Sequence, residues 1–278
     1  LQTSDPHIWA VGDVIEVRDG VTGLWSLIPL AGPANRQGRI VADNISGRAS
    51  RYGKTWGTAV LRLFRLTAAC TGASAKSLRR AGIPFETVHL HPGSHAGYFP
   101  GAEPVALKLL FAPETGKILG AQAVGRDGVD KRIDVIATAL QGGMTVHDLA
   151  GMELAYAPPF GSAKDPVNLA GMTAQNLLAD DVRQIQWDEV ASLPAETVLL
   201  DVRSQAEHDA GFIPGAIHIP VNSLRERLSE LPRGRTIVAY CQSGLRSYIA
   251  ARMLTQHGFD VRNLSGAYRT WRMATANV

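Results

Sequence analysis

About the last hundred residues alternate short apolar runs with segments in which apolar side chains recur every three or four positions. The first kind of segment is typical of buried strands and the second of helices. The pattern predicts strands at 197–201, 216–219, 236–240 and 261–264, and helices at 205–210, 223–231 and 247–257. Strands that alternate with helices indicate a parallel sheet with helices on both faces, whose ligand site lies at the carboxyl ends of the strands.

The middle of the chain, from about residue 57 to residue 176, has a mixed pattern. Alternating apolar and polar positions predict one half-buried strand over 60–66. Two apolar runs joined by a turn with Pro and Gly predict a hairpin, and two amphipathic segments that end at glycine predict helices. These elements are the strands 105–111 and 118–124 and the helices 73–81 and 129–141.

The first 45 residues open with a polar turn and a short apolar run, Ile8–Val11, which predicts a strand that ends on Gly12 and Asp13. Glycine lets the backbone approach a ligand closely, and an aspartate at a strand end can accept hydrogen bonds from sugar hydroxyls. A second apolar run leads into a helix that we expect to start near Leu30. Gly-Asp after a strand is common, so the assignment of a site here depends on the resemblance described below.

Composition favours a soluble globular protein of two or more domains, without nucleic-acid or membrane partners. The 278 residues are 45% hydrophobic and 19% charged, and the net charge of +3 is too small to indicate nucleic acid. No apolar run reaches the roughly 18 residues of a membrane span. Only two cysteines occur, Cys70 and Cys241, which favours a reducing cytoplasm over a disulfide-forming compartment.

Three histidines, His89, His91 and His95, raise the question of a metal site, because alternate positions on a strand share a face. No cysteine or carboxylate accompanies them in the combinations that zinc sites use. We therefore expect polar strand residues here and no bound metal.

The chemistry of the chain centres on Cys241, which follows the predicted strand 236–240 and precedes a helix. Unpaired N–H groups and the positive end of the helix dipole favour a thiolate at this place, and Arg246 adds a positive charge. We therefore expect a nucleophilic thiol. The alternative is a small buried hydrophobic residue, which most lone cysteines are.

Cys241 to Arg246 spans six residues, C-x4-R, whereas the corresponding phosphatase loops are one residue longer. Together with Leu200–Arg203 and the segment from Glu207 to Ala216, this loop resembles the rhodanese family of sulfurtransferases over about the last hundred residues. One departure is Phe212, which stands where the family usually has a histidine of structural importance.

The resemblance implies that Cys241 carries sulfur as a persulfide, taken from a sulfane-sulfur donor and passed to a thiol acceptor. Arg246 would orient the loop, and the loop residues would bind the outer sulfur; these are Gln242, Ser243, Gly244, Leu245 and Ser247. Two alternatives remain open, namely a phosphatase or arsenate reductase on the same fold and a non-catalytic docking domain. A structural ion pair or a capping role, and not catalysis, is expected for Asp201 and Arg203.

The Gly12-Asp13 stretch and the helix after it resemble the second FAD motif of flavoproteins with two dinucleotide-binding domains. The resemblance implies that Gly12, Asp13, Leu30 and Ala31 bind FAD and that Asn35 contacts coenzyme A. The G-x-G-x-x-G turns for FAD and NAD(P)H are missing from the sequence. We therefore expect a C-terminal piece of a longer enzyme, which by itself retains neither cofactor.

The middle region resembles the dimerisation domain of the pyridine nucleotide–disulfide oxidoreductases, and in particular the coenzyme A disulfide reductase branch. The resemblance is carried by Ser94–Gly101, Gly128–Asp134 and Leu154–Pro166. It implies a homodimer in which Tyr156 assists the redox cysteine of the partner subunit.

Together these observations predict a protein of the α/β and α+β classes. We expect the C-terminal remnant of an FAD domain at 1–56, a dimerisation domain with a mixed sheet at 57–178, and a rhodanese-like domain with a parallel sheet at 179–278. The parent enzyme would be a FAD- and NAD(P)H-dependent reductase of coenzyme A disulfide, persulfide or polysulfide.

Overall fold

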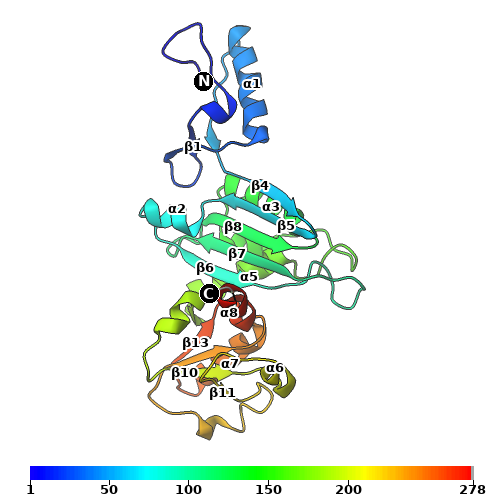
Figure 1. The fold of residues 1–278 in the computed structure, drawn as a ribbon, viewed down its shortest axis with the longest axis vertical. Coiled ribbons are helices and arrows are strands. Elements are labelled where there is room, and N and C mark those ends of the chain that lie inside the picture. The colour runs from blue at the N-terminus through cyan, green and yellow to red at the C-terminus, as the bar shows by residue number, and fades with distance from the viewer. Residues whose placement is uncertain (277–278) are drawn as a thin grey trace. The chain divides into compact units, whose positions relative to one another are not determined.

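The structure, a computed structural model, describes residues 1–276. The chain divides into two compact units, and each is described by itself (Figure 1). The first unit comprises residues 1–86 and 109–145, and the second comprises residues 87–108 and the chain from residue 146 onward.

The first unit begins with a small sheet of order β2-β1-β3 and one long helix. Its elements are η1 (Gly12–Val14), β1 (Val17–Asp19), β2 (Trp25–Ser26), α1 (Ala31–Ile45) and β3 (Lys54–Thr55). The strand predicted at Ile8–Val11 is wrong, because Trp9 forms only an isolated bridge with Gln2 and residues 12–14 are a 3-10 helix. A short apolar run becomes a strand only where a neighbouring strand pairs with it.

A second sheet has the strand order β4-β5-β8-β7-β6. Its strands are β4 (Ala59–Leu63), β5 (Leu66–Gly72), β6 (Glu86–Leu90), β7 (Val105–Phe111) and β8 (Ile118–Gly125), and its helices are α2 (Ala75–Arg80) and α3 (Val129–Gln141). The single strand predicted over 60–66 is wrong. Phe64 has a φ of 54°, and the chain reverses there so that Leu63 pairs with Leu66 in a β4–β5 hairpin. The predicted hairpin of β7 and β8 and the helix α3 are confirmed.

The second unit contains α4 (Val146–Gly151) and α5 (Pro166–Leu178). The Asp165 side chain starts α5 with a capping box, and Pro166 occupies the first helical turn, where its missing N–H costs nothing. Helix α5 ends at Leu178, just before the segment that leads into the third sheet.

The third sheet is parallel throughout, with the order β11-β10-β12-β13-β9, and confirms the predicted fold class. Its strands are β9 (Arg183–Ile185), β10 (Val198–Asp201), β11 (Ile217–His218), β12 (Ile237–Tyr240) and β13 (Val261–Leu264). The helices around it are η2 (Trp187–Ser192), α6 (Gln205–Asp209), η3 (Leu228–Glu230), α7 (Leu245–Gln256) and α8 (Ala267–Thr275). The helix predicted over 223–231 is wrong, because this segment forms successive turns and only the three-residue η3. Pro232 contributes to this outcome, since the residue before a proline disfavours helical backbone.

The central strand β12 is buried on both faces, and its side chains alternate between two apolar clusters. Ile237 and Ala239 pack into one cluster with residues of α7, whereas Val238 and Tyr240 pack into the other with Tyr268 of α8. Because side chains alternate along a strand, Cys241 continues the α7 face. Helix α7 and the Tyr268 side chain of α8 therefore pack against opposite faces of β12.

Candidate active site: the Cys241 loop

The residues 241–246, called here the Cys241 loop, connect β12 to α7. The Gly244 N–H donates to the Cys241 Sγ at 3.1 Å, and the Ser247 hydroxyl lies 3.5 Å from the same sulfur. Gly244 has a φ of +116° and precedes the first residue of α7. Only glycine adopts this backbone conformation without strain, so the sequence places it where the chain must turn its amide onto the thiol.

The carbonyl groups of the loop are fixed by the first turn of α8. The Tyr268 N–H donates to the Cys241 carbonyl at 3.0 Å, and the Arg269 N–H donates to the Gln242 carbonyl at 3.1 Å. In a trans peptide the N–H points away from the preceding carbonyl. The N–H groups of Gln242 and Ser243 are therefore directed away from α8.

Helix α8 was not predicted from the sequence, although it fixes the loop. The sequence does contain a pattern that indicates this helix. Gly266, with a φ of +68°, precedes it, and Tyr268 and Trp271 lie three residues apart and pack against the sheet. A side chain at Gly266 would collide with Thr270. The pattern is short, so it gives a helix only in the context of the packed sheet.

A buried hydrogen-bond network centred on Arg203 supports the loop. Arg203 donates to the Asp201 carboxylate at 2.6 Å, to the Gly211 carbonyl at 2.7 Å and to the Gln242 Oε1 at 3.3 Å. Its guanidinium lies 4.1 Å from the centre of the Tyr268 ring. Burial raises the pKa of Asp201, but the hydrogen bonds from Arg203 and His208 outweigh it and hold the pKa below its usual value. The predicted ion pair of Asp201 and Arg203 is present, and it reaches the loop through Gln242.

Arg246 makes a two-pronged ion pair with Glu207 of α6, at 2.7 and 2.6 Å. The hydrogen bond from Arg246 lowers the pKa of Glu207 to about 2, so the carboxylate is charged throughout the neutral range. The same bond raises the pKa of Arg246, and the neighbouring Cys241 thiol adds to the effect. Glu207 was not predicted as a site residue, since its partner lies 39 positions away in the chain.

The thiol itself is only 1% exposed and belongs to the apolar cluster on the α7 face. Of the predicted loop residues, Gly244 and Ser247 contact the sulfur, and Gln242 contacts Arg203. Leu245 is 68% exposed and points away from the core. The site thus combines a shielded sulfur, an amide donor, a hydroxyl and an arginine, a set that can stabilise negative charge on a sulfur atom.

Tyr156 lies elsewhere in the second unit, and its hydroxyl is 2.8 Å from the hydroxyl of Tyr98. Both side chains are exposed. The hydrogen bond to Tyr98 raises the pKa of Tyr156. Tyr98 was not predicted as a site residue, although it lies within the Ser94–Gly101 string that carried the resemblance.

The predicted FAD residues lie in the first unit at the η1–α1 corner, defined as residues 12–13 and 30–35. The Gly12 N–H donates to the buried Gln37 side chain at 2.7 Å, which ties η1 to α1. Asp13 is exposed, and the first turn of α1 has no side-chain cap at Leu30. An exposed carboxylate beside uncapped helix N–H groups fits a ligand with hydroxyl donors and carbonyl acceptors, such as a flavin with its sugar chain. The Asn35 amide instead donates to the Ala31 carbonyl of its own helix.

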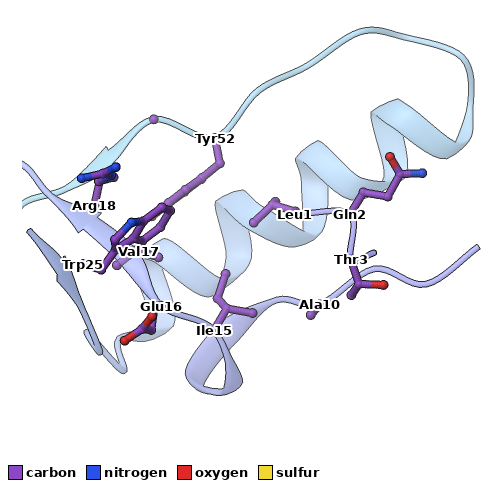
Figure 2. A pocket seen from close by; sticks show the side chains of 11 residues that line it. Leu1, Gln2, Thr3, Ala10, Ile15, Glu16, Val17, Arg18, Trp25 and Tyr52 are labelled. Carbon is purple, nitrogen blue, oxygen red and sulfur yellow. The ribbon is translucent and has the colours of Figure 1, made fainter. Parts of the chain in front are cut away.

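A pocket of about 320 Å³ lies near this corner in the same unit, and Figure 2 shows its lining. The Arg18 guanidinium lies 4.5 Å from the centre of the Trp25 ring, and Tyr52 and Ile15 also line the pocket. None of the five residues predicted to bind FAD or coenzyme A lines it. The pocket and the predicted corner are therefore distinct features.

The three histidines do not form a metal site. His89 is hydrogen-bonded to Gln186 and His91 to Thr270, while His95 contacts the carbonyl of Ala96. Burial lowers the pKa of both His89 and His91 to about 4. Within residues 1–276 no group of three or more histidine, cysteine, aspartate or glutamate side chains could hold a metal ion, and none of the helices described there could cross a membrane.

Two family models match the chain. The dimerisation domain of the pyridine nucleotide-disulphide oxidoreductases matches residues 59–166, and the rhodanese-like domain matches residues 179–274. The two matches cover the sheet with the β4–β5 hairpin and the sheet that holds the Cys241 loop, respectively.

Individual relatives agree with this division. Coenzyme A disulfide reductase of Staphylococcus epidermidis is 39% identical over 176 residues, which are 63% of this chain and 40% of that protein. The structure of reduced Bacillus anthracis CoADR-RHD has 49% identity and a TM-score of 0.95, and it covers 98% of this chain and 49% of the other. A NAD-dependent persulfide reductase from A. fulgidus has 39% identity and a TM-score of 0.89, with coverage of 97% and 49%. The chain thus spans half the length of these relatives or less, and it is similar to the coenzyme A disulfide reductases, with a rhodanese-like domain at its C-terminal end.

Proposed function

We propose that Cys241 carries a sulfane sulfur as a persulfide and passes it to a thiol acceptor. The observation that carries the proposal is the Gly244 N–H directed at the Cys241 Sγ, within a loop whose carbonyls are bound by α8. Preorganised N–H donors stabilise charge that develops on a reacting atom, because they need not reorient during the reaction. Arg246, which Glu207 holds in place, lies beside the same sulfur.

Two displacement steps describe the transfer. The Cys241 thiolate attacks the outer sulfur of a donor R–S–SH, the S–S bond of the donor breaks, and R–S⁻ leaves and takes a proton from solvent. The product is Cys241–S–SH. An acceptor thiolate R′–S⁻ then attacks the outer sulfur, which gives R′–S–SH and regenerates the Cys241 thiolate. No electrons are gained or lost overall, so the loop needs no cofactor for this half of the chemistry.

In the intact protein we propose a FAD- and NAD(P)H-dependent reductase of coenzyme A disulfide, persulfide or polysulfide. Two of the matched relatives support this proposal, because one is a coenzyme A disulfide reductase and the other is a NAD-dependent persulfide reductase. Gly12, Asp13, Leu30 and Ala31 would hold part of the FAD, which supplies electron transfer from NAD(P)H when bound. We propose domains at 1–56, 57–178 and 179–278, and the family matches support the last two.

We propose further that the protein is a homodimer and that Tyr156, together with Tyr98, acts at the redox site of the partner subunit. The family match over 59–166 supports dimerisation, and so do exposed apolar side chains of the β4–β5 hairpin, including Val60, Leu61 and Phe64. Light scattering should report twice the mass of the chain, and a monomer at micromolar concentration would contradict the assignment.

Cys70 and Cys241 are both free thiols, which supports a cytoplasmic location.

Mass spectrometry tests the sulfur carrier. After exposure to a sulfane-sulfur donor, we expect a gain of one sulfur atom on the peptide that contains Cys241, and its loss when a thiol is added. Cys241→Ser should not gain the sulfur, whereas Cys70→Ser should behave as the wild type. Equal labelling of the wild type and Cys241→Ser, or turnover of an aryl phosphate without labelling, would contradict the proposal.

A further inference from the structure

The charge of Arg246 is matched before any substrate arrives. Both terminal nitrogens of Arg246 donate to Glu207, one to each carboxylate oxygen. The pair is about one-third exposed, at 36% for Arg246 and 31% for Glu207, whereas the neighbouring Cys241 is buried. An approaching anion therefore meets a neutral ion pair instead of a free cation.

Arg203, the other arginine whose side chain reaches the loop, is also engaged. Arg203 is fully buried and paired with Asp201, and His208 is hydrogen-bonded to the same carboxylate. Arg246 and Arg203 are therefore both matched by carboxylates, so neither of these two arginines offers an unpaired charge to a small dianion.

The surface beside the loop is apolar. Leu245 is 68% exposed and Ile249, one helical turn later on α7, is 50% exposed. Phe212 is 45% exposed, and its ring centre lies 4.4 Å from that of His208, on which it stacks. His208 directly follows Glu207 in the chain. Side chains of this kind contact the carbon skeleton of a substrate and offer nothing to an inorganic anion.

We propose that Glu207 determines which sulfur donor the loop accepts, favouring organic persulfides over small inorganic dianions such as thiosulfate. This inference rests on the proposed sulfur transfer. With thiosulfate, the Cys241 thiolate would attack the outer sulfur and release sulfite, leaving Cys241–S–S⁻. Thiosulfate carries two negative charges and the Cys241 thiolate carries one, so they repel each other. Arg246 reduces this repulsion only weakly, because Glu207 already balances its charge. An organic persulfide brings at most one charge and an apolar carrier.

Glu207→Gln is the direct test, because glutamine can keep the capping box with Ser204 at the start of α6. Glu230→Gln is the matched control, since Glu230 forms a similar exposed pair with Arg227 away from the loop. The rate constants for sulfur gain at Cys241 are measured by mass spectrometry in the full chain, with thiosulfate and with benzyl hydropersulfide as donors.

We expect Glu207→Gln to raise the rate constant for thiosulfate relative to that for benzyl hydropersulfide by at least about fivefold, and the effect to shrink in high salt. Glu230→Gln should leave the ratio unchanged. Ile249→Ser should slow benzyl hydropersulfide selectively, which gives a second test if Glu207→Gln folds poorly. An unchanged donor ratio in folded Glu207→Gln, or in Ile249→Ser where Glu207→Gln does not fold, would overturn the inference while leaving the sulfur carrier intact. Failure of the wild type to gain sulfur from either donor would instead overturn the proposed function and this inference with it.

Discussion

The Cys241 loop and the η1–α1 corner were both predicted from short motifs. In the structure they differ in how firmly neighbouring residues hold their polar groups in place. At the loop, three components are supported by further residues: α8 fixes two carbonyls, Arg203 holds Gln242, and Glu207 holds Arg246. At the corner, Asp13 is exposed and the first turn of α1 lacks a side-chain cap. The loop is therefore a site organised in advance, whereas the corner offers single groups to a ligand that must itself complete the site.

This difference teaches that the two motifs depend on their surroundings to different degrees. A preorganised site loses function when distant supporting residues change, because their packing sets the positions of the reacting groups. An exposed site tolerates the same kind of change. Substitutions of matched chemistry in the two regions should therefore have unequal effects.

The largest difference is expected for Arg203→Met at the loop and Asp13→Asn at the corner. Removing Arg203 leaves the Asp201 carboxylate buried without its ion-pair partner, which we expect to cost about 3–5 kcal/mol. Asp13 is exposed, so its replacement should change stability by less than about 0.5 kcal/mol. Native-state hydrogen exchange of the β12 amides measures the first loss, and exchange of the α1 amides measures the second. Similar protection of β12 in wild type and Arg203→Met would remove the distinction between the regions.

A smaller contrast is expected between Gly244→Ala in the loop and Gly38→Ala in α1. No atom lies within 4 Å of a Cβ added at either position, so the backbone alone decides. Alanine at a φ of +116° is strained and should destabilise the protein by about 1–3 kcal/mol. Gly38 lies inside an exposed helix, where alanine should stabilise by about 0.5–1 kcal/mol. Urea denaturation gives both values. A loss at Gly38 or a gain at Gly244 would contradict the prediction, and slower sulfur gain by Gly244→Ala would sharpen it.

The smallest effect concerns pH and the buried histidines near α8. Burial lowers the pKa of both His89 and His91 to about 4. Lys108 adds to the effect at His89, where Gln186 and Asp188 oppose it, and Arg269 and His89 add to it at His91. The unfolded chain takes up protons below its ordinary histidine pKa of about 6.5, whereas the folded chain does not until about pH 4. Stability is thus complete above pH 6.5 and falls as the pH approaches 4.

Between pH 7.5 and 5.5 we expect a loss of about 1 kcal/mol for each histidine. Urea midpoints measured across this range should fall less steeply for His91→Gln than for the wild type. The α1 amides should show no matching change in hydrogen exchange. A slope that is the same in both proteins would show that His91 is not responsible.

The sequence predicted the local parts of the site and missed the distant ones. Cys241, Gly244 and Arg246 lie within six residues, so a strand–loop–helix pattern was enough to predict them. Glu207 and α8 are far from the loop in sequence, and only the packed sheet brings them to it. The same reason explains the errors in the fold, because the reversal at Phe64 depends on a strand pairing that alternation alone does not reveal.

Helix α8 makes two kinds of contact at once. Its first-turn N–H groups hold the carbonyls of Cys241 and Gln242, and Thr270 in the next turn holds His91 at 2.7 Å. Because one short helix makes both contacts, α8 links the segment around His91 to the Cys241 peptide. We therefore expect the segment around His91 to tune how fast sulfur leaves Cys241, although it contributes no atom to the reaction.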